Sequence, residues 1–354
     1  MSVYDVTVRR ILRRSHQLDH GHYAVGIEIQ PYRLAGVVVD SGGTVTARSR
    51  RHLTIMEPTE VAERVAELAG RLVADSLGCD FPRTRVCLGV QVGGPVDPDT
   101  GVVRRLRNGP DDHGEDKPPP YEWVEFPLGA ALTAMTGCIT SVENDAHAFA
   151  AYEQILGVGR ESPTFAVVLI RDGVGAGLVV RGERLRVLME FGHLQVWQRG
   201  RVCDCGMRGC IESQVGNRAL TAVVKERTGR ELDGLEAALA LADSDEAQAL
   251  EAAAAFRKAG TSMARGIATL LTTFGPSHVV IHAAQGLITG GPGRRAANTF
   301  LRAVGQFPTH TFPISRDCRI VTKPLDAFRG AHGAALIALQ NCFGVRLPNA
   351  QPNI

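Results

Sequence analysis

The chain has 354 residues, of which 44% are hydrophobic and 21% are charged, a balance typical of soluble globular proteins. This length allows two domains of ordinary size, and no window approaches the ~18 to 20 consecutive apolar residues that a membrane span requires. The 39 basic and 37 acidic residues leave a net charge of +2, which is too small by itself to indicate a nucleic-acid-binding surface.

A basic leader opens the chain at residues 1–22. Its first 21 residues, MSVYDVTVRRILRRSHQLDHG, lack the apolar stretch and the small-residue cleavage site of a secretory signal. We therefore expect a cytoplasmic protein that makes no membrane contact. The stretch VTVRRILRRSH is typical of a solvated leader, and a linker remnant or a short basic helix is the alternative.

An N-terminal α/β lobe is predicted for residues 23–150. Three Val- and Ile-rich segments, HYAVGIEI, RLAGVVVD and GTVTARSRRHL, predict successive strands, and PTEVAERVAELAGRLVADSLG has helical periodicity. RVCLGVQVGGPVD predicts a buried strand that ends at its glycines, and the Pro- and Asp-rich RNGPDDHGEDKPPP predicts an exposed insertion. GCITSVENDAHAFAAYEQILG predicts a strand and a helix, with Asn144 and Asp145 at the turn between them.

A C-terminal α/β lobe is predicted for residues 151–354. It opens with TFAVVLIRDGVGAGLVVRGERL, which predicts two strands around a glycine turn. A loop at 193–210 and a helical segment at 211–274 follow, and then the strand HVVIHAA and the closing helix GAHGAALIALQNCF. Strands followed by helices, twice over, indicate two α/β lobes around a cleft.

Three cysteines stand close together in the loop, at Cys203, Cys205 and Cys210, and His193 precedes them. Together they make a Cys3His set, which is a closed tetrahedral ligand shell for a structural Zn2+. The alternatives are a flexible loop with spare thiols or a redox pair of Cys203 and Cys205. Three exposed thiols would be open to oxidation in a cytoplasmic protein, and this favours zinc.

The segments EFGH and CDCGMRGCIES resemble the zinc signature of the ROK family, which groups sugar kinases, sugar-responsive repressors and relatives of unassigned role. The resemblance extends along nearly the whole chain, because VGGPVD, EW before FPL, VENDAHAF, DGVGAGLVVRG and GAHGAA follow the family's order. It implies a two-lobed, actin-like (ribonuclease-H-like) α/β fold with a cleft between the lobes and a structural zinc loop.

The resemblance implies a sugar or sugar phosphate as ligand. Asp145 would be the general base if the protein is a kinase, and Asn144 would bind neighbouring hydroxyls, since carboxylates and amides accept hydrogen bonds from hydroxyl groups. The alternative for this pair is an Asx turn that caps the following helix. Gly94 would let the backbone approach the sugar closely.

Glu190, His193 and Glu212 would supply the remaining sugar contacts, again by resemblance. One ring nitrogen of His193 would bind zinc, and the other would then be free to hydrogen-bond outward to a hydroxyl. The metal would in this way organise a sugar site.

The phosphate-binding turn departs from the family's kinases, which have Asp-x-Gly-Gly-Thr-Lys where this chain has GIEIQPYRLAG. Glu28 replaces the Asp, and Gln30 and Pro31 stand where glycines belong. Pro31 has no N–H to offer a phosphate, and Gln30 does not allow the close backbone approach of glycine. We therefore expect an eroded phosphate site.

The other nucleotide contacts are weak. His282, Ala283 and Ala284 occupy positions where ATP-using relatives tend to have a glycine pair. The glycine turn persists at three positions, but hairpins use such turns too. These nucleotide candidates are Gly173, Gly175 and Gly177.

A retained sugar site and zinc loop together with an eroded phosphate site resemble the effector domain of ROK transcriptional regulators. We therefore expect a carbohydrate-responsive regulator rather than an enzyme. Too few residues precede the first strand for a winged helix-turn-helix, and direct DNA binding is not supported by this chain alone; a truncated gene model or a stand-alone sensor would explain this. The alternative is a hexose, amino-sugar or cyclitol kinase that uses ATP, Mg2+ and Asp145. The zinc loop resembles a dimerising region, so a homodimer is expected.

Overall fold

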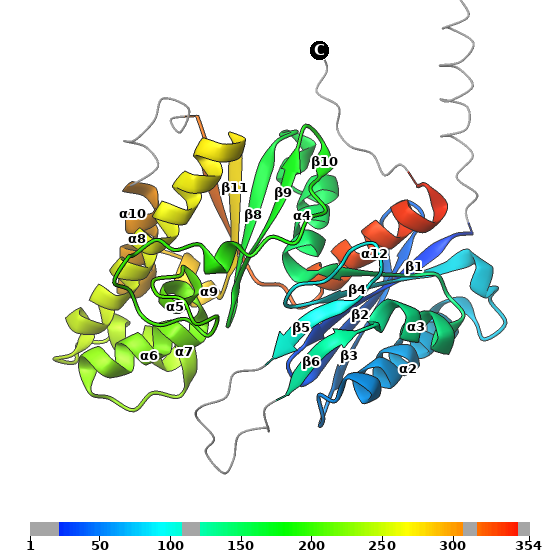
Figure 1. Ribbon diagram of the computed structural model, residues 1–354, viewed down its shortest axis with the longest axis horizontal. Helices are drawn as coiled ribbons and strands as arrows, with labels where there is room; N and C mark the ends of the chain where they lie inside the picture. Colours follow the sequence, from blue (N-terminus) through cyan, green and yellow to red (C-terminus); the bar gives the residue numbers. More distant parts are fainter. Residues whose placement is uncertain (1–20, 108–120, 307–316, 346–354) are drawn as a thin grey trace, which may run out of the picture. The chain divides into compact units, whose positions relative to one another are not determined.

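The computed structural model describes residues 21–107, 121–306 and 317–345, and the chain divides into two compact units (Figure 1). The described part of the first unit is residues 21–107, 121–155 and 327–345, and the second unit takes 156–306 and 317–326. Almost all of the expected leader and of the expected insertion lies outside the described residues. Among the helices within those ranges, none combines the length and the apolar composition that a membrane crossing needs.

The first unit is built on a five-stranded mixed sheet with the order β3-β2-β1-β4-β7. The first three strands form an antiparallel meander, and β4 and β7 then run parallel to β1. The strands are β1 (Tyr23–Gln30), β2 (Arg33–Asp40), β3 (Val45–His52), β4 (Val86–Val92) and β7 (Thr140–Asn144). A separate hairpin pairs β5 (Val103–Arg107) with β6 (Glu122–Phe126).

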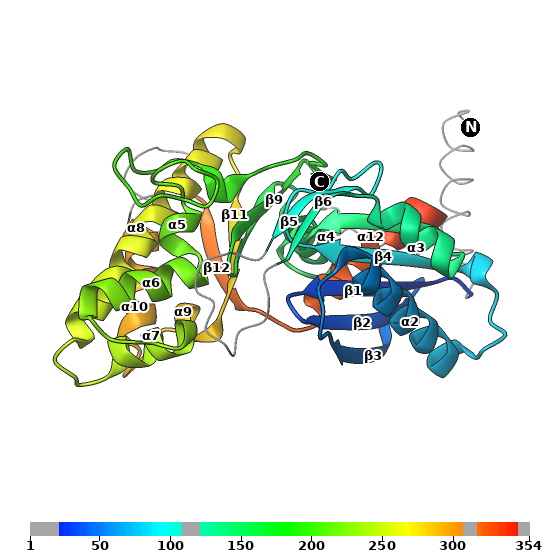
Figure 2. The same ribbon diagram turned by 60° about the horizontal axis from the view of Figure 1, so that its bottom comes forward.

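Helices cover both faces of this sheet, so its strands are apolar on both sides (Figures 1 and 2). Val38 faces the core under α2 (Pro58–Leu77), whereas Val37 and Val39 face α12 (Arg329–Phe343). The other helices of the unit are η1 (Arg83–Arg85), α3 (Leu128–Thr136) and α4 (Asp145–Leu156).

The C-terminal helix α12 was expected in the second lobe, and this expectation was wrong. It packs on β1 and β4 of the first unit because glycines leave room for it there. A Cβ on Gly26 would overlap the carbonyl oxygen of Ala331, and a Cβ on Gly89 would overlap that of Ala334. The helix backbone therefore lies directly against the sheet.

The second unit repeats the sheet arrangement of the first, with the order β10-β9-β8-β11-β12. Again three antiparallel strands come first, and two strands parallel to the first of them follow. The strands are β8 (Phe165–Ile170), β9 (Val174–Val180), β10 (Glu183–Arg184), β11 (His278–Ala283) and β12 (Arg319–Pro324). Two units with one topology confirm the predicted pair of α/β lobes.

Helices dominate the rest of the second unit, as the sequence predicts. The long helix α8 (Ala249–Phe274) buries Phe256, Met263 and Ile267 in the core of the unit, where α10 also packs (Figure 1). The remaining helices are η2 (Val158–Arg160), η3 (Phe191–His193), α5 (Glu212–Val215), α6 (Asn217–Thr228), α7 (Gly234–Asp243), α9 (Gln285–Ile288) and α10 (Arg295–Gln306).

Candidate functional site

Asn144 ends β7 and directly precedes α4, so its side chain lies at the N-terminus of a helix. Its Oδ1 accepts a hydrogen bond from the backbone N–H of Ala146 at 2.9 Å, and its Nδ2 donates to the carbonyl oxygen of Gly94 at 2.8 Å. The first bond is that of a helix cap, the alternative that the sequence left open. The second ties the end of β7 to the loop after β4.

Asp145 is the first residue of α4 and lies beside the same loop. One carboxylate oxygen accepts a hydrogen bond from the N–H of Ala146 at 2.8 Å, and the other lies 4.0 Å from where a Cβ on Gly93 would be. Gly94 has φ +78°, and a Cβ there would lie 2.5 Å from the carbonyl oxygen of Arg105. The first unit thus brings three predicted sugar-site residues together: Gly94, Asn144 and Asp145.

The β1–β2 connection, where the family's kinases have their phosphate turn, is a tight turn formed by Pro31 and Tyr32. Glu28 is fully buried on β1, and its Oε1 accepts a hydrogen bond from Gln30 Nε2. Gln30 Oε1 in turn accepts one from Arg33 Nη2. The polar side chains at this turn are therefore hydrogen-bonded to one another.

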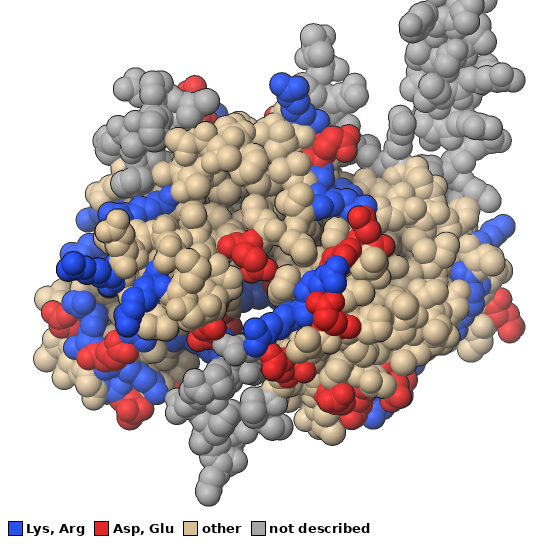
Figure 3. Space-filling model, in the orientation of Figure 1, with Lys and Arg blue, Asp and Glu red and all other residues tan. Residues whose placement is uncertain are grey.

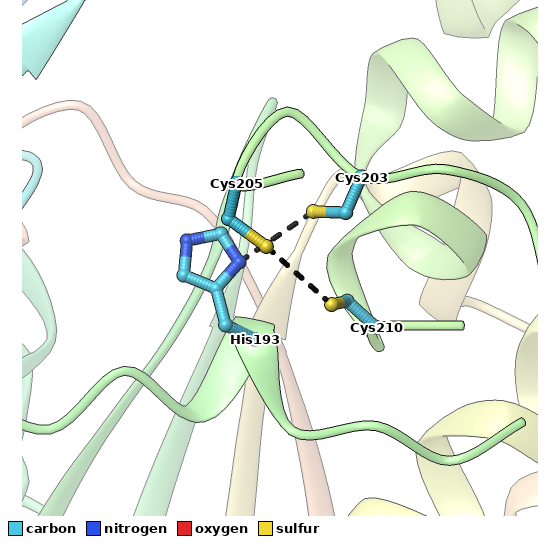
Figure 4. Close-up of side chains that lie close together, drawn as sticks. All are labelled: His193, Cys203, Cys205 and Cys210. Atoms are coloured by element: carbon cyan, nitrogen blue, oxygen red, sulfur yellow. Dashed lines mark hydrogen bonds between the residues drawn. The ribbon is translucent and has the colours of Figure 1, made fainter. Parts of the chain in front are cut away.

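The second unit places the four predicted metal ligands around one point, with their side chains directed toward each other (Figure 4). One ligand atom from each residue lies within 4.8 Å of those of the other three. Cys203 Sγ lies 3.5 Å from His193 Nδ1, and Cys205 Sγ lies 3.7 Å from Cys210 Sγ. Within the described part of the chain, this is the one such group of His, Cys, Asp and Glu side chains.

These separations fit a tetrahedral zinc ion. Bonds of about 2.3 Å to sulfur and about 2.0 Å to nitrogen would place two sulfurs about 3.8 Å apart and a sulfur and a nitrogen about 3.5 Å apart. Burial raises the pKa of the Cys203 thiol to about 12 and raises that of Cys210 as well. A bound dication would offset that cost, because it favours the thiolate.

The loop turns back on itself at two glycines. Gly206 has φ +86° and Gly209 has φ +74°, and a Cβ on Gly209 would overlap the carbonyl oxygen of Trp197. Isolated bridges pair Val202 with Arg208 and Gln195 with Cys210. Small residues at these positions therefore let the chain bring ligands from both ends of the loop to one centre.

His193 has its two ring nitrogens in different surroundings. Nδ1 faces the thiols, and Nε2 lies 3.7 Å from the carboxylate of Glu190, which is longer than a hydrogen bond. The sequence predicts this division between a metal-side nitrogen and an outward nitrogen. Glu190 is exposed, and His193 is partly exposed.

Glu212 has a backbone partner in addition to its expected role. Its Oε2 accepts a hydrogen bond from the N–H of Val174 at 3.0 Å and lies 2.9 Å from where a Cβ on Gly173 would be. The carboxylate thus fastens the start of α5 to the β8–β9 turn. A side chain at 173 would therefore crowd the Glu212 carboxylate.

The other nucleotide candidates lie within strands. Gly175 and Gly177 pair with Leu169 and Val167 across the β8–β9 hairpin. His282, which stands where ATP-using relatives tend to have a glycine, is fully buried on β11. These three residues therefore have the strand pairing or the burial that belongs to a β-sheet.

Charged side chains of both signs intermingle over each unit on the face drawn in Figure 3. In the second unit some of them form ion pairs, among them Arg227 with Glu251 at 2.6 Å and Lys225 with Glu231 at 3.0 Å.

Comparison with known proteins gives matches over most of the chain. A sequence model of the ROK family matches residues 24–341. The glucokinase of Streptomyces coelicolor is 26% identical over 275 residues, which are 73% of this chain and 80% of the glucokinase. The xylose repressor of Bacillus subtilis is 23% identical over 263 residues, which are 73% of this chain and 63% of the repressor.

Solved structures agree with the fold. A ROK hexokinase from Thermus thermophilus matches with a TM-score of 0.71 at 24% identity, over 91% of this chain and 99% of the hexokinase. The chain therefore has the two-lobed fold of the actin-like ATPases. Because proteins named as kinases and as repressors match at similar identity, similarity alone does not choose between the two activities.

Proposed function

The chain belongs to the ROK family, and from this premise we propose that it is a zinc-stabilised sugar-binding protein of the regulator type, whose nucleotide site has been lost. Its ligand is a sugar or sugar phosphate, and its output is a carbohydrate-responsive regulatory one. It acts as a homodimer in the cytoplasm.

The observation that carries this proposal is the hydrogen-bonding at the β1–β2 turn. A phosphate site of this kind needs free backbone N–H groups and a carboxylate available to the metal ion. Here Pro31 removes one N–H, and Gln30 and Arg33 form a hydrogen-bonded chain onto the Glu28 carboxylate. Binding of a magnesium triphosphate would have to break these bonds.

The proposed sugar contacts are those expected from the resemblance. Gly94 would allow close backbone approach, and the side chains would be the amide of Asn144, the carboxylates of Asp145, Glu190 and Glu212, and the imidazole of His193. These groups are hydrogen-bond acceptors and donors of the kind that sugar hydroxyls require. The glutamates and Asp145 suit a polyhydroxylated neutral ligand best.

Zinc would be held by His193, Cys203, Cys205 and Cys210, and it would fix the loop and neutralise the thiolates. With Nδ1 bound to zinc, the imidazole proton would lie on Nε2. Since Glu190 lies 3.7 Å from Nε2, beyond hydrogen-bond distance, His193 would be able to donate from there to a sugar hydroxyl. Four protein ligands would leave no coordination position for a substrate, so the role of the site would be structural.

A sugar kinase is the second candidate, and Asp145 favours it. An aspartate at the start of α4 has the right chemistry for a general base that accepts a proton from a sugar hydroxyl. A sensor could bind hydroxyls with asparagine instead. In this alternative, ATP and Mg2+ would be needed, and the nucleotide candidates are the glycines at 173, 175 and 177.

Phosphoryl transfer separates the two candidates. A thermal-shift screen of monosaccharides, amino sugars and their phosphates first identifies a ligand, and a product assay with ATP and Mg2+ then follows. We expect a stabilising sugar and no phosphorylated product, and Asp145→Asn should weaken sugar binding about tenfold. Sugar phosphorylation by the wild-type protein that Asp145→Asn abolishes would establish the kinase instead.

A further inference from the structure

Trp197 lies in the zinc loop between His193 and Cys203, and its ring packs against α8. The guanidinium carbon of Arg265 lies 3.6 Å from the centre of the ring, and Trp197 Nε1 donates a hydrogen bond to Ser262 Oγ at 2.9 Å. Ser262 and Arg265 are three residues apart on α8, so they share one face of the helix. Ser262 is completely buried.

Arg265 also makes a hydrogen bond to the zinc loop. Its Nη1 donates to the carbonyl oxygen of Val196 at 2.8 Å, while its buried Nε has no hydrogen-bond partner within the described part of the chain. A buried polar group without a partner is costly, and the cation–π contact with the ring and the hydrogen bond to the Val196 carbonyl offset part of that cost. Arg265 therefore contacts two consecutive residues of the loop, Val196 and Trp197.

The position of Trp197 also fixes the far end of the loop. The N–H groups of Val196 and Trp197 donate to the carbonyl oxygen of Gly209, at 2.9 and 3.2 Å. Gly209 directly precedes the ligand Cys210, and Gly209 itself approaches Trp197 too closely for any side chain. Holding Trp197 on α8 therefore also holds the segment that carries Cys210.

A second contact of α8 reaches the residues beside both outer ligands. A Cβ on Gly266 would lie 2.8 Å from the ring of Phe191 and would overlap the side chain of Ile211. Phe191 precedes His193 by two residues, and Ile211 follows Cys210. The absence of a side chain at 266 thus lets both segments pack against the helix.

We propose that Trp197, clamped by Arg265 and Ser262, is a positioning residue for the zinc loop, which brings the ligands together by packing and so raises the affinity for zinc. The inference rests on the proposed zinc centre. None of the four ligands takes part in the clamp. Ordering the zinc loop costs conformational entropy. The contacts of Trp197 with α8 offset part of this cost, so that less of it falls on zinc binding.

Zinc affinity is the direct test, measured by competition with a chromophoric chelator on the full chain. Arg265→Met and Trp197→Leu should bind zinc about 10 to 100-fold more weakly than the wild type, the range found when groups behind metal ligands are removed. Arg257→Met, an exposed arginine on the same helix, is the matched control and should leave the affinity unchanged. Arg265→Lys and Trp197→Phe are milder variants for the case that the first pair does not fold.

The outcomes distinguish a failure of the proposed clamp from a failure of the proposed zinc centre. If the wild type binds no stoichiometric zinc, the zinc centre of the proposed function is wrong, and the clamp fails with it. If the wild type binds zinc and the folded Arg265 and Trp197 variants bind it equally well, the clamp alone is wrong.

Tryptophan fluorescence gives a second readout, because the chain has two tryptophans and Trp123 lies fully buried in the first unit. The Trp197→Phe protein supplies the Trp123 signal for subtraction. Removing zinc with EDTA should leave the Trp197 emission maximum unchanged in the wild type and shift it to longer wavelength in Arg265→Met. A red shift in the wild type as large as that in the variant would show that the metal alone orders Trp197.

Discussion

At the scale of one residue, neighbouring groups of the first unit restrict the backbone conformation of Gly94 in the candidate site. Its φ of +78° lies in the left-handed region, and the carbonyl oxygen of Arg105 occupies the space where a side chain would begin. Asn144 then hydrogen-bonds to the Gly94 carbonyl. The backbone of residue 94 is thus held from two sides, next to Asp145.

Gly94→Ala should therefore be destabilised by about 1–3 kcal/mol, because it adds both backbone strain and a steric overlap. The control is Gly137→Ala, where φ is +68° but no atom lies within 4 Å of the new Cβ. Urea unfolding should show a larger loss for the first variant than for the second. Equal losses would mean that the Arg105 contact does not constrain the loop.

His332 predicts a dependence of stability on pH. Burial lowers the pKa of its imidazole, and the nearby Arg48 lowers it further, although the carbonyl of Gly43 acts in the opposite direction. Below a pH of about 6.5 the unfolded chain takes up a proton that the native protein resists, so the free energy of unfolding falls as the pH falls. Above that pH the residue contributes no such dependence.

The measurement is urea unfolding at about pH 7.5 and about pH 5.5. The wild type should lose more stability between these values than His332→Gln, which has no proton to gain. An identical loss in both proteins would contradict the assignment to His332.

At the scale of elements, the seating of α12 depends on glycines in two strands of the sheet. Gly89→Ala forces a methyl group against the carbonyl oxygen of Ala334, and overpacking of this kind costs about 1–3 kcal/mol, sometimes more. Gly70→Ala is the opposite control, since it lies inside α2 with no atom near the new Cβ, and it should stabilise the protein by up to about 1 kcal/mol. Thermal unfolding compares the two variants, and a neutral Gly89→Ala would mean that α12 can move away from the sheet at little cost.

The zinc loop carries a prediction about the metal. Cys205→Ser removes an exposed ligand and should reduce bound zinc from one equivalent to far below it, as measured by elemental analysis after dialysis. Cys79→Ser, another exposed cysteine outside the cluster, should retain one equivalent. Full zinc occupancy in Cys205→Ser would exclude the Cys3His set.

Local elements were predictable because their patterns are local. Val61, Val65, Leu68 and Leu72 give a helical period that α2 confirms, and β2 has the predicted bounds. The position of α12 was not predictable, because the glycines that receive it are more than two hundred residues away in the sequence. Helix α10 was missed although Ala296, Phe300 and Val304 recur at helical spacing, which is a signal that the sequence offered. Strand β12 was missed, and none of its residues is fully buried.

At the scale of the whole molecule, the sequence identifies site residues better than it identifies their roles. The metal ligands were predicted from spacing and glycines, and the structure brings all four together. Asn144 and Glu212 were expected to contact sugar, yet the structure also gives both of them backbone partners that hold loops in place. The hydrogen bonds from Gln30 and Arg33 at the β1–β2 turn, and the clamp on Trp197, depend on side-chain positions that no spacing reveals.

The absence of nucleotide binding is the central claim, and titration calorimetry tests it most directly. The zinc-loaded protein, saturated with a sugar from the thermal-shift screen, is titrated with ATP and Mg2+. We predict heat of binding for the sugar and none for the nucleotide at concentrations up to about 1 mM, a range in which a functional site would be occupied. Saturable ATP binding would contradict the claim, and its loss in Glu28→Gln would place the nucleotide at the β1–β2 turn.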